Sequence, residues 1–332
     1  MPPSIFHAII GHDNAQRVLN RMALMGRLPH AILFVGGHHI GKTLMARQLI
    51  ASLFPAGYSI ESNPDYMELG CLIDEKTLPT GRQAGKKKSN ISVEQIRELC
   101  ERMSQSAMNG GWKVGFIREA NALSIGAANA FLKTLEEPKG KTLFILRAPS
   151  LESVPATIAS RCQIIRFHAV PREILEQALV KKGFARSDAI AAAAFSLGRP
   201  GRAIRYLTKS EERSQSDIAF AQAMDVFSAS IAKQIRVSAE LLPKEDVNKR
   251  TVAEQAIQSW QGVLRDVLLV SIGCAELVTH TDQQGKIRAM SEQLHCNQLI
   301  ELLHRTSDAR NALCHNTNPL LTLEHILFTV HS

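Results

Sequence analysis

Short apolar runs alternate with amphipathic stretches through the first half of the chain. Runs of four or five mostly apolar residues predict strands at 31–35, 66–69, 113–117, 142–146 and 163–167. Between these runs, apolar residues recur at helical spacing and predict helices at 14–25, 44–54, 92–103 and 124–136. Ser92, with Gln95 three residues later, has the spacing of a capping box that starts the third helix. Strands that alternate with helices predict a parallel sheet in an α/β fold.

The strand pattern stops after residue 167, and only helices are predicted beyond it. Helices at 171–182 and 187–196 precede the break Gly-Arg-Pro-Gly-Arg at 198–202, and a third begins near Ala203. Long helices follow from about residue 215, the last at 320–330. Residues 55–90 contain several Pro and Gly and keep no period. We therefore predict an α/β module at 1–168, a helical lid at 169–208 and an all-α domain at 209–332.

The length and the charge of the chain indicate how many domains it has and what kind of partner it binds. A chain of 332 residues exceeds one ordinary core and calls for two or three domains. The content of 45% hydrophobic and 21% charged residues is that of a water-soluble globular protein. A formal charge of +8 indicates an anionic partner, most simply nucleic acid, although a mildly basic protein without one is the alternative. The basic residues are spread along the chain, with one run at 86–88.

The cysteines and the apolar runs indicate a cytoplasmic protein that does not enter a membrane. Cysteines stand at 71, 100, 162, 274, 296 and 314, and none has C-x-x-C spacing, so neither a zinc ribbon nor a redox motif is predicted. Their scatter is typical of reduced thiols in the cytoplasm. The first residues lack the pattern of a secretory signal, and no apolar run reaches 18 residues.

Residues 36–43 read G-G-H-H-I-G-K-T, the complete pattern of a phosphate-binding loop between a strand and a helix. Gly36 and Gly41 allow backbone N–H groups to turn toward a phosphate chain. Lys42 is expected to reach the β and γ oxygens, and Thr43 to hold Mg²⁺. ATP or ADP is the predicted ligand. The alternative is a glycine-rich turn that binds nothing.

The strand at 113–117 lacks the acid that a hydrolysing site requires at its end. ATP hydrolysis needs a carboxylate that holds magnesium and, in many families, a following Glu that orients the attacking water. Glu119 has the position of the second carboxylate, but Arg118 stands where the first belongs, and a guanidinium cannot ligate a cation. Hydrolysis is therefore expected to be weak or absent. The alternative for Glu119 is a surface carboxylate paired with Arg118. His12, His38 and His39 have no ligand partners at suitable spacing, so no metal is predicted there.

Two long segments resemble the clamp-loader subunits of bacterial DNA polymerase, which are AAA+ proteins. Residues 121–138 include A-A-N-A-F-L-K-T-L-E-E-P, and residues 157–163 read T-I-A-S-R-C-Q. Weaker similarity at 9–12, 198–203 and 316–324 extends the resemblance over nearly the whole chain. The resemblance implies an AAA+ module with a parallel sheet, a small helical lid and a helical collar through which subunits assemble.

The resemblance also assigns two arginines. Arg161 is implied to be an arginine finger that acts in trans on the γ-phosphate bound by a neighbouring subunit. Arg202 is implied to reach from the lid to the nucleotide of this chain. From the residues alone, Arg161 is as readily an ion-pair partner of a carboxylate at a helix end, and Arg202 a solvent-exposed residue at a helix start.

The implied function is to help load the sliding clamp onto primed DNA, with the gamma or tau and delta subunits as partners. DNA is expected to be contacted through its phosphates. Only Cys71 remains where motor subunits of the family carry four zinc ligands, so zinc is not predicted. Two alternatives stay open. One is an active motor ATPase of the clamp-loader or another AAA+ class, and the other is a nucleotide-binding scaffold outside replication.

Overall fold

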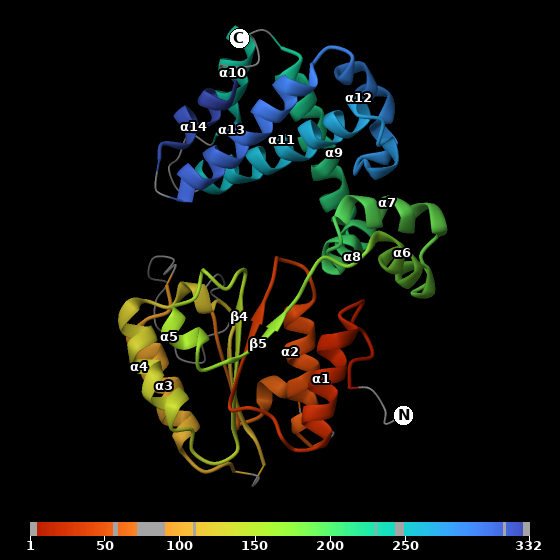
Figure 1. Ribbon diagram of the computed structural model, residues 1–332. Coiled ribbons are helices and arrows are strands. Elements are labelled where there is room, and N and C mark those ends of the chain that lie inside the picture. The colour runs from red at the N-terminus through yellow and green to blue at the C-terminus, as the bar shows by residue number, and fades with distance from the viewer. Residues whose placement is uncertain are drawn as a thin grey trace. The chain divides into compact units, whose positions relative to one another are not determined.

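The computed structural model describes residues 5–55, 59–71, 90–108, 111–229, 231–242, 249–314 and 317–327 (Figure 1). The chain forms two compact units. The first comprises Met1–Leu175 with Gly198–Gly201, and the second Glu176–Leu197 with Arg202–Ser332. The division into module, lid and collar remains a prediction. None of the helices in the described ranges combines the length and the apolar character needed to cross a membrane.

The first unit is built on a five-stranded parallel sheet in the order β2-β3-β4-β1-β5. The strands are β1 (Ala31–Val35), β2 (Tyr66–Leu69), β3 (Lys113–Ile117), β4 (Thr142–Ala148) and β5 (Gln163–Arg166). All five predicted strands are therefore confirmed. β4 is two residues longer than predicted, because Arg147 and Ala148 stay in register with Phe34 and Val35 of β1.

Helices cover both faces of this sheet, α1 and α2 on one side and α3, α4 and α5 on the other (Figure 1). Their bounds are α1 (Asp13–Leu24), α2 (Lys42–Leu53), α3 (Val93–Ser104), α4 (Ile125–Glu136) and α5 (Ala156–Ala159), with short 3-10 turns η1 (Ile60–Ser62) and η2 (Ala120–Ala122). Every residue of β1 and β3 is buried, as expected for parallel strands covered on both faces.

The predicted capping box is present at the start of α3. The Ser92 side chain accepts from the backbone N–H of Gln95 at 3.4 Å, and the Gln95 side chain accepts from the backbone N–H of Ser92 at 2.9 Å. α2 begins at Lys42, two residues before the predicted start, because Gly41 has φ 109° and ends the phosphate loop there. Neither η2 nor α5 is in the sequence prediction.

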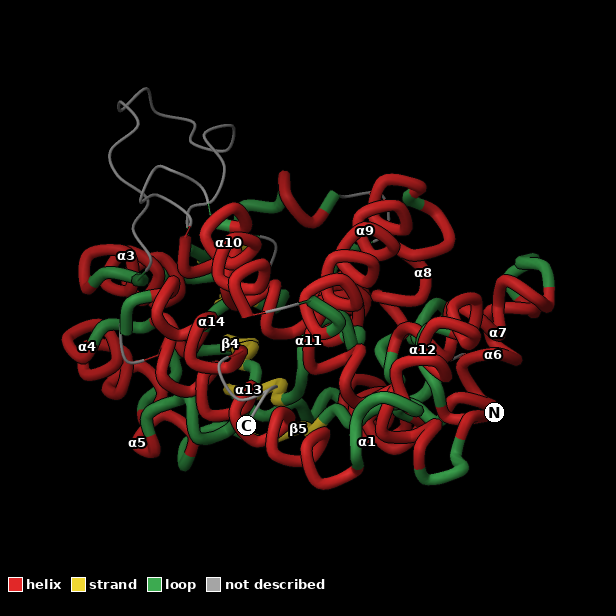
Figure 2. Tube along the Cα trace, turned by 90° about the horizontal axis from the view of Figure 1, so that it is seen from above, coloured by secondary structure: helices red, strands yellow, loops and turns green. Residues whose placement is uncertain are grey.

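The described residues of the second unit form helices and turns but no strand, as predicted, and the helices of the chain are drawn in red in Figure 2. Two helices, α6 (Arg172–Lys181) and α8 (Pro200–Thr208), begin in the first unit and continue in the second. The other helices of the second unit are α7 (Arg186–Ser196), α9 (Ser210–Phe227), α10 (Ile231–Leu241), α11 (Lys249–Ser271), α12 (Gln284–Ser291), α13 (Cys296–Cys314) and α14 (Pro319–Leu327), with η4 (Ala275–Leu277) and η5 (Thr281–Gln283). α8 starts three residues before the predicted Ala203, because Pro suits the first turn of a helix. Residues 328–330 of the predicted last helix lie outside the described residues.

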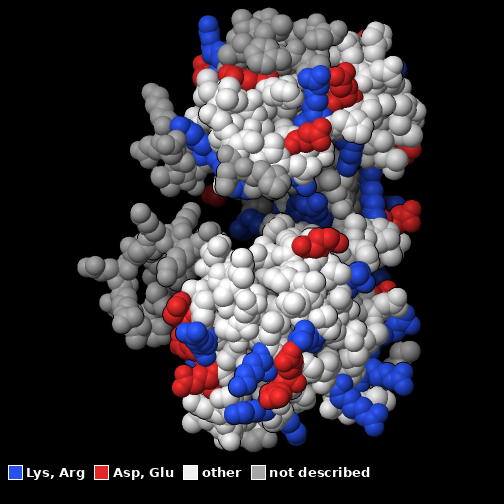
Figure 3. Space-filling model, turned by 60° about the vertical axis from the view of Figure 1, so that its left-hand side comes forward, with Lys and Arg blue, Asp and Glu red and all other residues white. Residues whose placement is uncertain are grey.

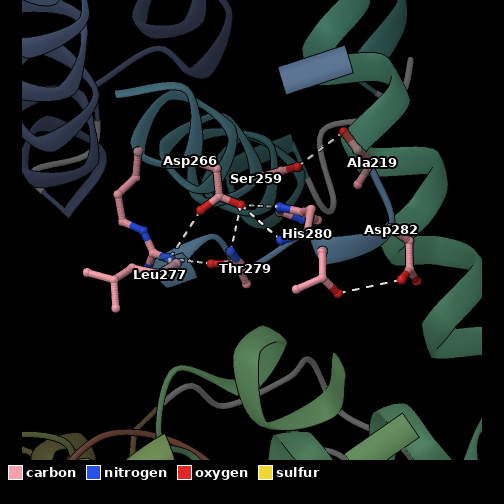
Figure 4. A network of polar contacts seen from close by, with 9 residues as sticks. Ala219, Ser259, Asp266, Leu277, Thr279, His280 and Asp282 are labelled. Carbon is pink, nitrogen blue, oxygen red and sulfur yellow. Dashed lines mark hydrogen bonds and ion pairs between the residues drawn. The ribbon is translucent and has the colours of Figure 1, made fainter. Parts of the chain in front are cut away.

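α11 is the central helix of the second unit and carries its one buried carboxylate among the described residues. Trp260 and Val267 of α11 lie in the hydrophobic core with residues of α9, α13 and α14. Asp266, on the same helix, is fully buried. Its carboxylate accepts from the backbone N–H groups of Thr279 and His280, both at 3.0 Å, and pairs with the His280 ring at 2.8 Å (Figure 4).

These contacts keep Asp266 charged inside the core. Burial alone would raise the pKa of Asp266, but the hydrogen bonds from His280 and the backbone of Thr279 outweigh burial and hold the pKa below its usual value. Arg265 adds an ion pair at 3.1 Å. The carboxylate thereby fixes the turn after η4 to the C-terminal part of α11.

We expect Asp266→Asn to lower the free energy of unfolding of the second unit by about 2–4 kcal/mol at pH 7, because the amide turns a donor toward groups that already donate. Urea unfolding followed by the fluorescence of Trp260, in a Trp112→Phe background, measures this change. Asp225→Asn, an exposed site on α9, is the matched control and should change little.

The effect of Asp266→Asn should depend on pH. The folded-state pKa of Asp266 lies below its unfolded value of about 3.9, so its ionised form stabilises the fold at neutral pH, and that stabilisation is lost as pH falls through the folded pKa. The difference between wild type and variant should therefore shrink below about pH 4. A difference that stays constant down to pH 2 would contradict this role of the charge.

Candidate functional site

The phosphate loop lies between the end of β1 and the start of α2. Gly36, His39 and Gly41 have φ of 153°, 61° and 109°, so the backbone takes the left-handed region three times within six residues. A side chain at position 36 would lie 2.5 Å from the carbonyl oxygen of Phe167, so only glycine fits there. The sheet and the loop therefore form the cradle that the sequence pattern predicts.

Lys42 is buried at the first position of α2. Its ammonium group donates to the carbonyl oxygens of Gly36 and, at 2.6 Å, of Gly37. Burial and, after it, the guanidinium of Arg147 lower the pKa of Lys42 to about 8. Lys42 is thus mostly protonated at neutral pH and faces the interior of its own loop, where a phosphate group would meet it.

Arg147 is the residue of this site that the sequence prediction missed. It lies in β4 opposite Phe34 of β1, one residue beyond the predicted end of the strand. Its Nη1 donates to the hydroxyl of Thr43, and its Nη2 pairs with Glu119 Oε1 at 2.9 Å. Its Nε donates to the carbonyl oxygen of Arg118 at 2.7 Å. A cation therefore does contact the predicted magnesium ligand, but it comes from β4.

Arg118 and Glu119 do not pair as the sequence alternative suggested. Arg118 forms its ion pair with Glu68 of β2, at 3.2 Å. Glu119 pairs with Arg147 through one oxygen and accepts from the backbone N–H of Cys71, at 3.1 Å, through the other. The alternative for Glu119 thus named the wrong arginine, because the partner of a residue at a strand end depends on which strands are neighbours.

The residues present at the loop do not fit magnesium. Mg²⁺ requires oxygen ligands in octahedral geometry, whereas the Thr43 hydroxyl is held by a guanidinium and both oxygens of Glu119 are engaged. The described residues contain no group of three or more His, Cys, Asp and Glu side chains able to hold a metal. The glycine cradle and Lys42 do fit the phosphates of a nucleotide. The lysine run at 86–88, like most of 55–90, lies outside the described residues.

A cavity of about 380 Å³ adjoins the loop through His12. The Nε2 atom of His12 lies 3.0 Å from the carbonyl oxygen of Ile40 in the loop, and its ring packs on Phe167. Burial lowers the pKa of His12, and burial followed by Lys42 lowers that of His38, so both rings are held neutral at the site. The cavity is lined by residues of α1 and of the segment after β5, among them Arg17, His168 and Ile174.

The two arginines that the resemblance assigns each contact another side chain. Arg161, in the turn between α5 and β5, has a side chain that is 35% exposed and pairs with Glu136, the last residue of α4. Its Nε donates to Glu136 Oε1 at 2.9 Å. This contact is the ion pair at a helix end that the sequence left as the alternative. Arg202, in the second unit, has its guanidinium 4.1 Å from the ring centroid of Phe195.

Comparison with known proteins connects this site to a family. Residues 11–171 match the family described as DNA polymerase III, delta subunit. The delta' subunit of DNA polymerase III from Haemophilus influenzae is 39% identical over 147 residues, which cover 44% of this chain and 41% of that protein. The gamma subunit from Buchnera aphidicola is 33% identical over 171 residues, covering 52% of this chain and 47% of that protein.

The chain thus spans less than half the length of these two relatives. Among solved structures, a gamma-subunit-related protein of Thermotoga maritima aligns with 94% of this chain and 98% of its own, at 16% identity and a TM-score of 0.41. The matched residues 11–171 include the phosphate loop, Arg147 and Arg161. Residues 11–171 of this chain are thus similar to the delta subunit of DNA polymerase III, and the relatives of 33% and 39% identity are named as subunits of the same polymerase.

Proposed function

We propose that this chain is a clamp-loader subunit that binds nucleotide, hydrolyses it poorly and assists a neighbouring ATPase subunit. Its work would be to help load the sliding clamp onto primed DNA, together with gamma or tau and delta subunits. One observation carries the assisting role: a guanidinium, and no carboxylate, contacts Thr43 in the described structure. A motor subunit needs a metal at that point to bridge the β and γ phosphates.

Arg161 supports the role of an arginine finger through its exposure. Its partner Glu136 has a side chain that is 50% exposed, and an exposed ion pair contributes at most about 1 kcal/mol. Exchange of Glu136 for a phosphate on a neighbouring subunit is therefore inexpensive. An arginine finger stabilises the charge that spreads over the phosphoryl oxygens during transfer.

Arg202 is proposed to approach the nucleotide of this chain from the helical lid, once nucleotide is bound. DNA is proposed to be contacted through phosphates by scattered basic side chains. On the face shown in Figure 3, Lys and Arg are interspersed with Asp and Glu and form no single broad patch. Such a distribution suits a subunit that shares DNA contacts with its neighbours.

An active motor ATPase is the second candidate, because the phosphate loop is complete and some of the relatives are named gamma and tau. Under that function, Arg147 would have to leave Thr43 and Glu119 would have to release it. The two functions differ in the turnover of the isolated chain.

We expect the purified chain to show no steady-state ATP turnover above that of its Lys42→Ala variant, because no carboxylate is available to hold magnesium at Thr43. A coupled ATPase assay in the presence of Mg²⁺ measures this. Robust turnover that Lys42→Ala removes would favour the motor and overturn the assisting role.

We expect Arg161→Ala to slow ATP hydrolysis at the neighbouring site on the order of 10³-fold. The DNA-stimulated ATP turnover of a clamp loader reconstituted with this chain should lose the part of the turnover that the neighbouring site contributes. The nucleotide affinity of the isolated chain should stay unchanged. Arg97→Ala, at an exposed site on α3, is the matched control. Full turnover of the assembly with Arg161→Ala would exclude the finger.

A further inference from the structure

A group that replaces magnesium in a phosphate-loop site must meet three requirements. The occupant must be cationic, it must contact the threonine after the loop lysine, and it must reach the phosphate chain at the carboxyl ends of the strands. Arg147 meets the first two in the described structure, since its guanidinium contacts Thr43 from the end of β4, the strand next to β1. The third depends on the hydrogen-bond donors that the guanidinium has left.

The guanidinium is fixed in place and still has donors to offer. Glu119, Thr43 and the carbonyl oxygen of Arg118 accept from Nη2, Nη1 and Nε respectively. A guanidinium has five N–H groups in a planar fork, so these contacts within the described residues leave two, one on each terminal nitrogen. Two such donors match the paired oxygens of a phosphate group.

Charge is conserved by this replacement. A hydrolysing site has a lysine, a divalent metal, the acid that holds the metal and a catalytic glutamate, with a net charge of about +1. Here Lys42, Arg147 and Glu119 form the site, and their formal charges also sum to +1. Arg147 thus takes the place of the metal together with its acid. The net charge that a polyphosphate would meet at the site stays positive.

The network is shielded enough for this charge to act on a ligand. The side chains of Arg147 and Glu119 are 25% and 29% exposed. Charge-assisted hydrogen bonds at such partly buried positions are stronger than those at the surface. Because Glu119 holds one edge of the guanidinium, little conformational entropy would be lost when a phosphate is bound.

We propose that Arg147 acts as a built-in cation in place of magnesium, so that the phosphate loop binds a nucleoside diphosphate or triphosphate without any divalent metal. This inference rests on the nucleotide binding in the proposed function, but not on the role of Arg161 or on assembly. Lys42 and the glycine cradle contact the phosphates from one side, and the Arg147 guanidinium contacts them from the other. At Thr43 and Glu119, the site offers magnesium no oxygen ligand that is not already engaged.

Titration calorimetry of the full chain with ADP and with ATP, in EDTA and in Mg²⁺, tests this inference. Binding should occur in EDTA, and Mg²⁺ should not tighten it. Arg147→Ala should weaken ADP binding in EDTA about 10- to 100-fold, the equivalent of one charge-assisted hydrogen bond. Mg²⁺ should restore part of that loss, because the Thr43 hydroxyl is then free to accept a metal.

Two further variants separate charge from structure. Arg147→Lys keeps the charge but not the fork, so it should bind ADP in EDTA with intermediate affinity. Lys42→Ala should abolish binding under both conditions. Arg97→Ala is again the control on an exposed surface, and the thermal midpoint of each variant shows whether the fold is kept.

The outcomes distinguish this inference from the proposed function. Binding of ADP by wild type only when Mg²⁺ is present would overturn the inference and leave nucleotide binding intact. Tighter binding by Arg147→Ala in EDTA would also overturn it, since Arg147 would then block the loop. Absence of any binding, with or without Mg²⁺, would remove both nucleotide binding and this inference, while the effect of Arg161→Ala on the assembly would still test the assisting role.

Discussion

The parallel register of β1 between β4 and β5 is the constraint on which the site depends. Val35 lies opposite Ala148 on one side and Arg166 on the other, so three strands end at one edge of the sheet. The backbone N–H of Gly36 donates to Ala148, and that of Phe167 donates to Val35. The phosphate loop thus starts from a position that the sheet has already fixed, and β4 delivers Arg147 beside it.

The charges at this edge come from residues far apart in the sequence. Lys42 is the first residue of α2, Glu119 follows β3, and Arg147 is the second-last residue of β4. A metal ion is exchangeable and imposes its own geometry, whereas a guanidinium is a permanent monovalent cation with fixed donor directions. A site of this kind favours holding phosphates over transferring them, which agrees with a subunit that assists the chemistry of its neighbour.

Arg147 and Arg161 belong to the same unit but differ in how firmly their neighbours hold their side chains. Arg147 is held by three partners at a partly buried position, so its displacement would leave Glu119 and Thr43 without their donor. Arg161 lies at the surface on an exposed Glu136, and the loss of that pair changes the free energy of folding little. The first arginine is suited to a fixed role within the chain, and the second to a contact made in an assembly.

The sequence by itself determined the five strands, the phosphate loop, the capping box at Ser92 and the change to helices after residue 167. These features follow from local periodicity and from residue types that few backbone conformations accept, and no knowledge of long-range contacts is needed for them. The two segments at 121–138 and 157–163 also sufficed to indicate the family, which the match over residues 11–171 supports.

Only the tertiary structure decided which cation meets Thr43. The sequence places Arg118 directly before Glu119, and local order alone favoured that arginine. The order β2-β3-β4-β1-β5 instead brings the end of β4 next to the loop, and the end of β3 next to Glu68 of β2. Strand order is set by how the whole sheet buries its two faces, so the neighbour of a strand end cannot be read from residues adjacent to it in the chain.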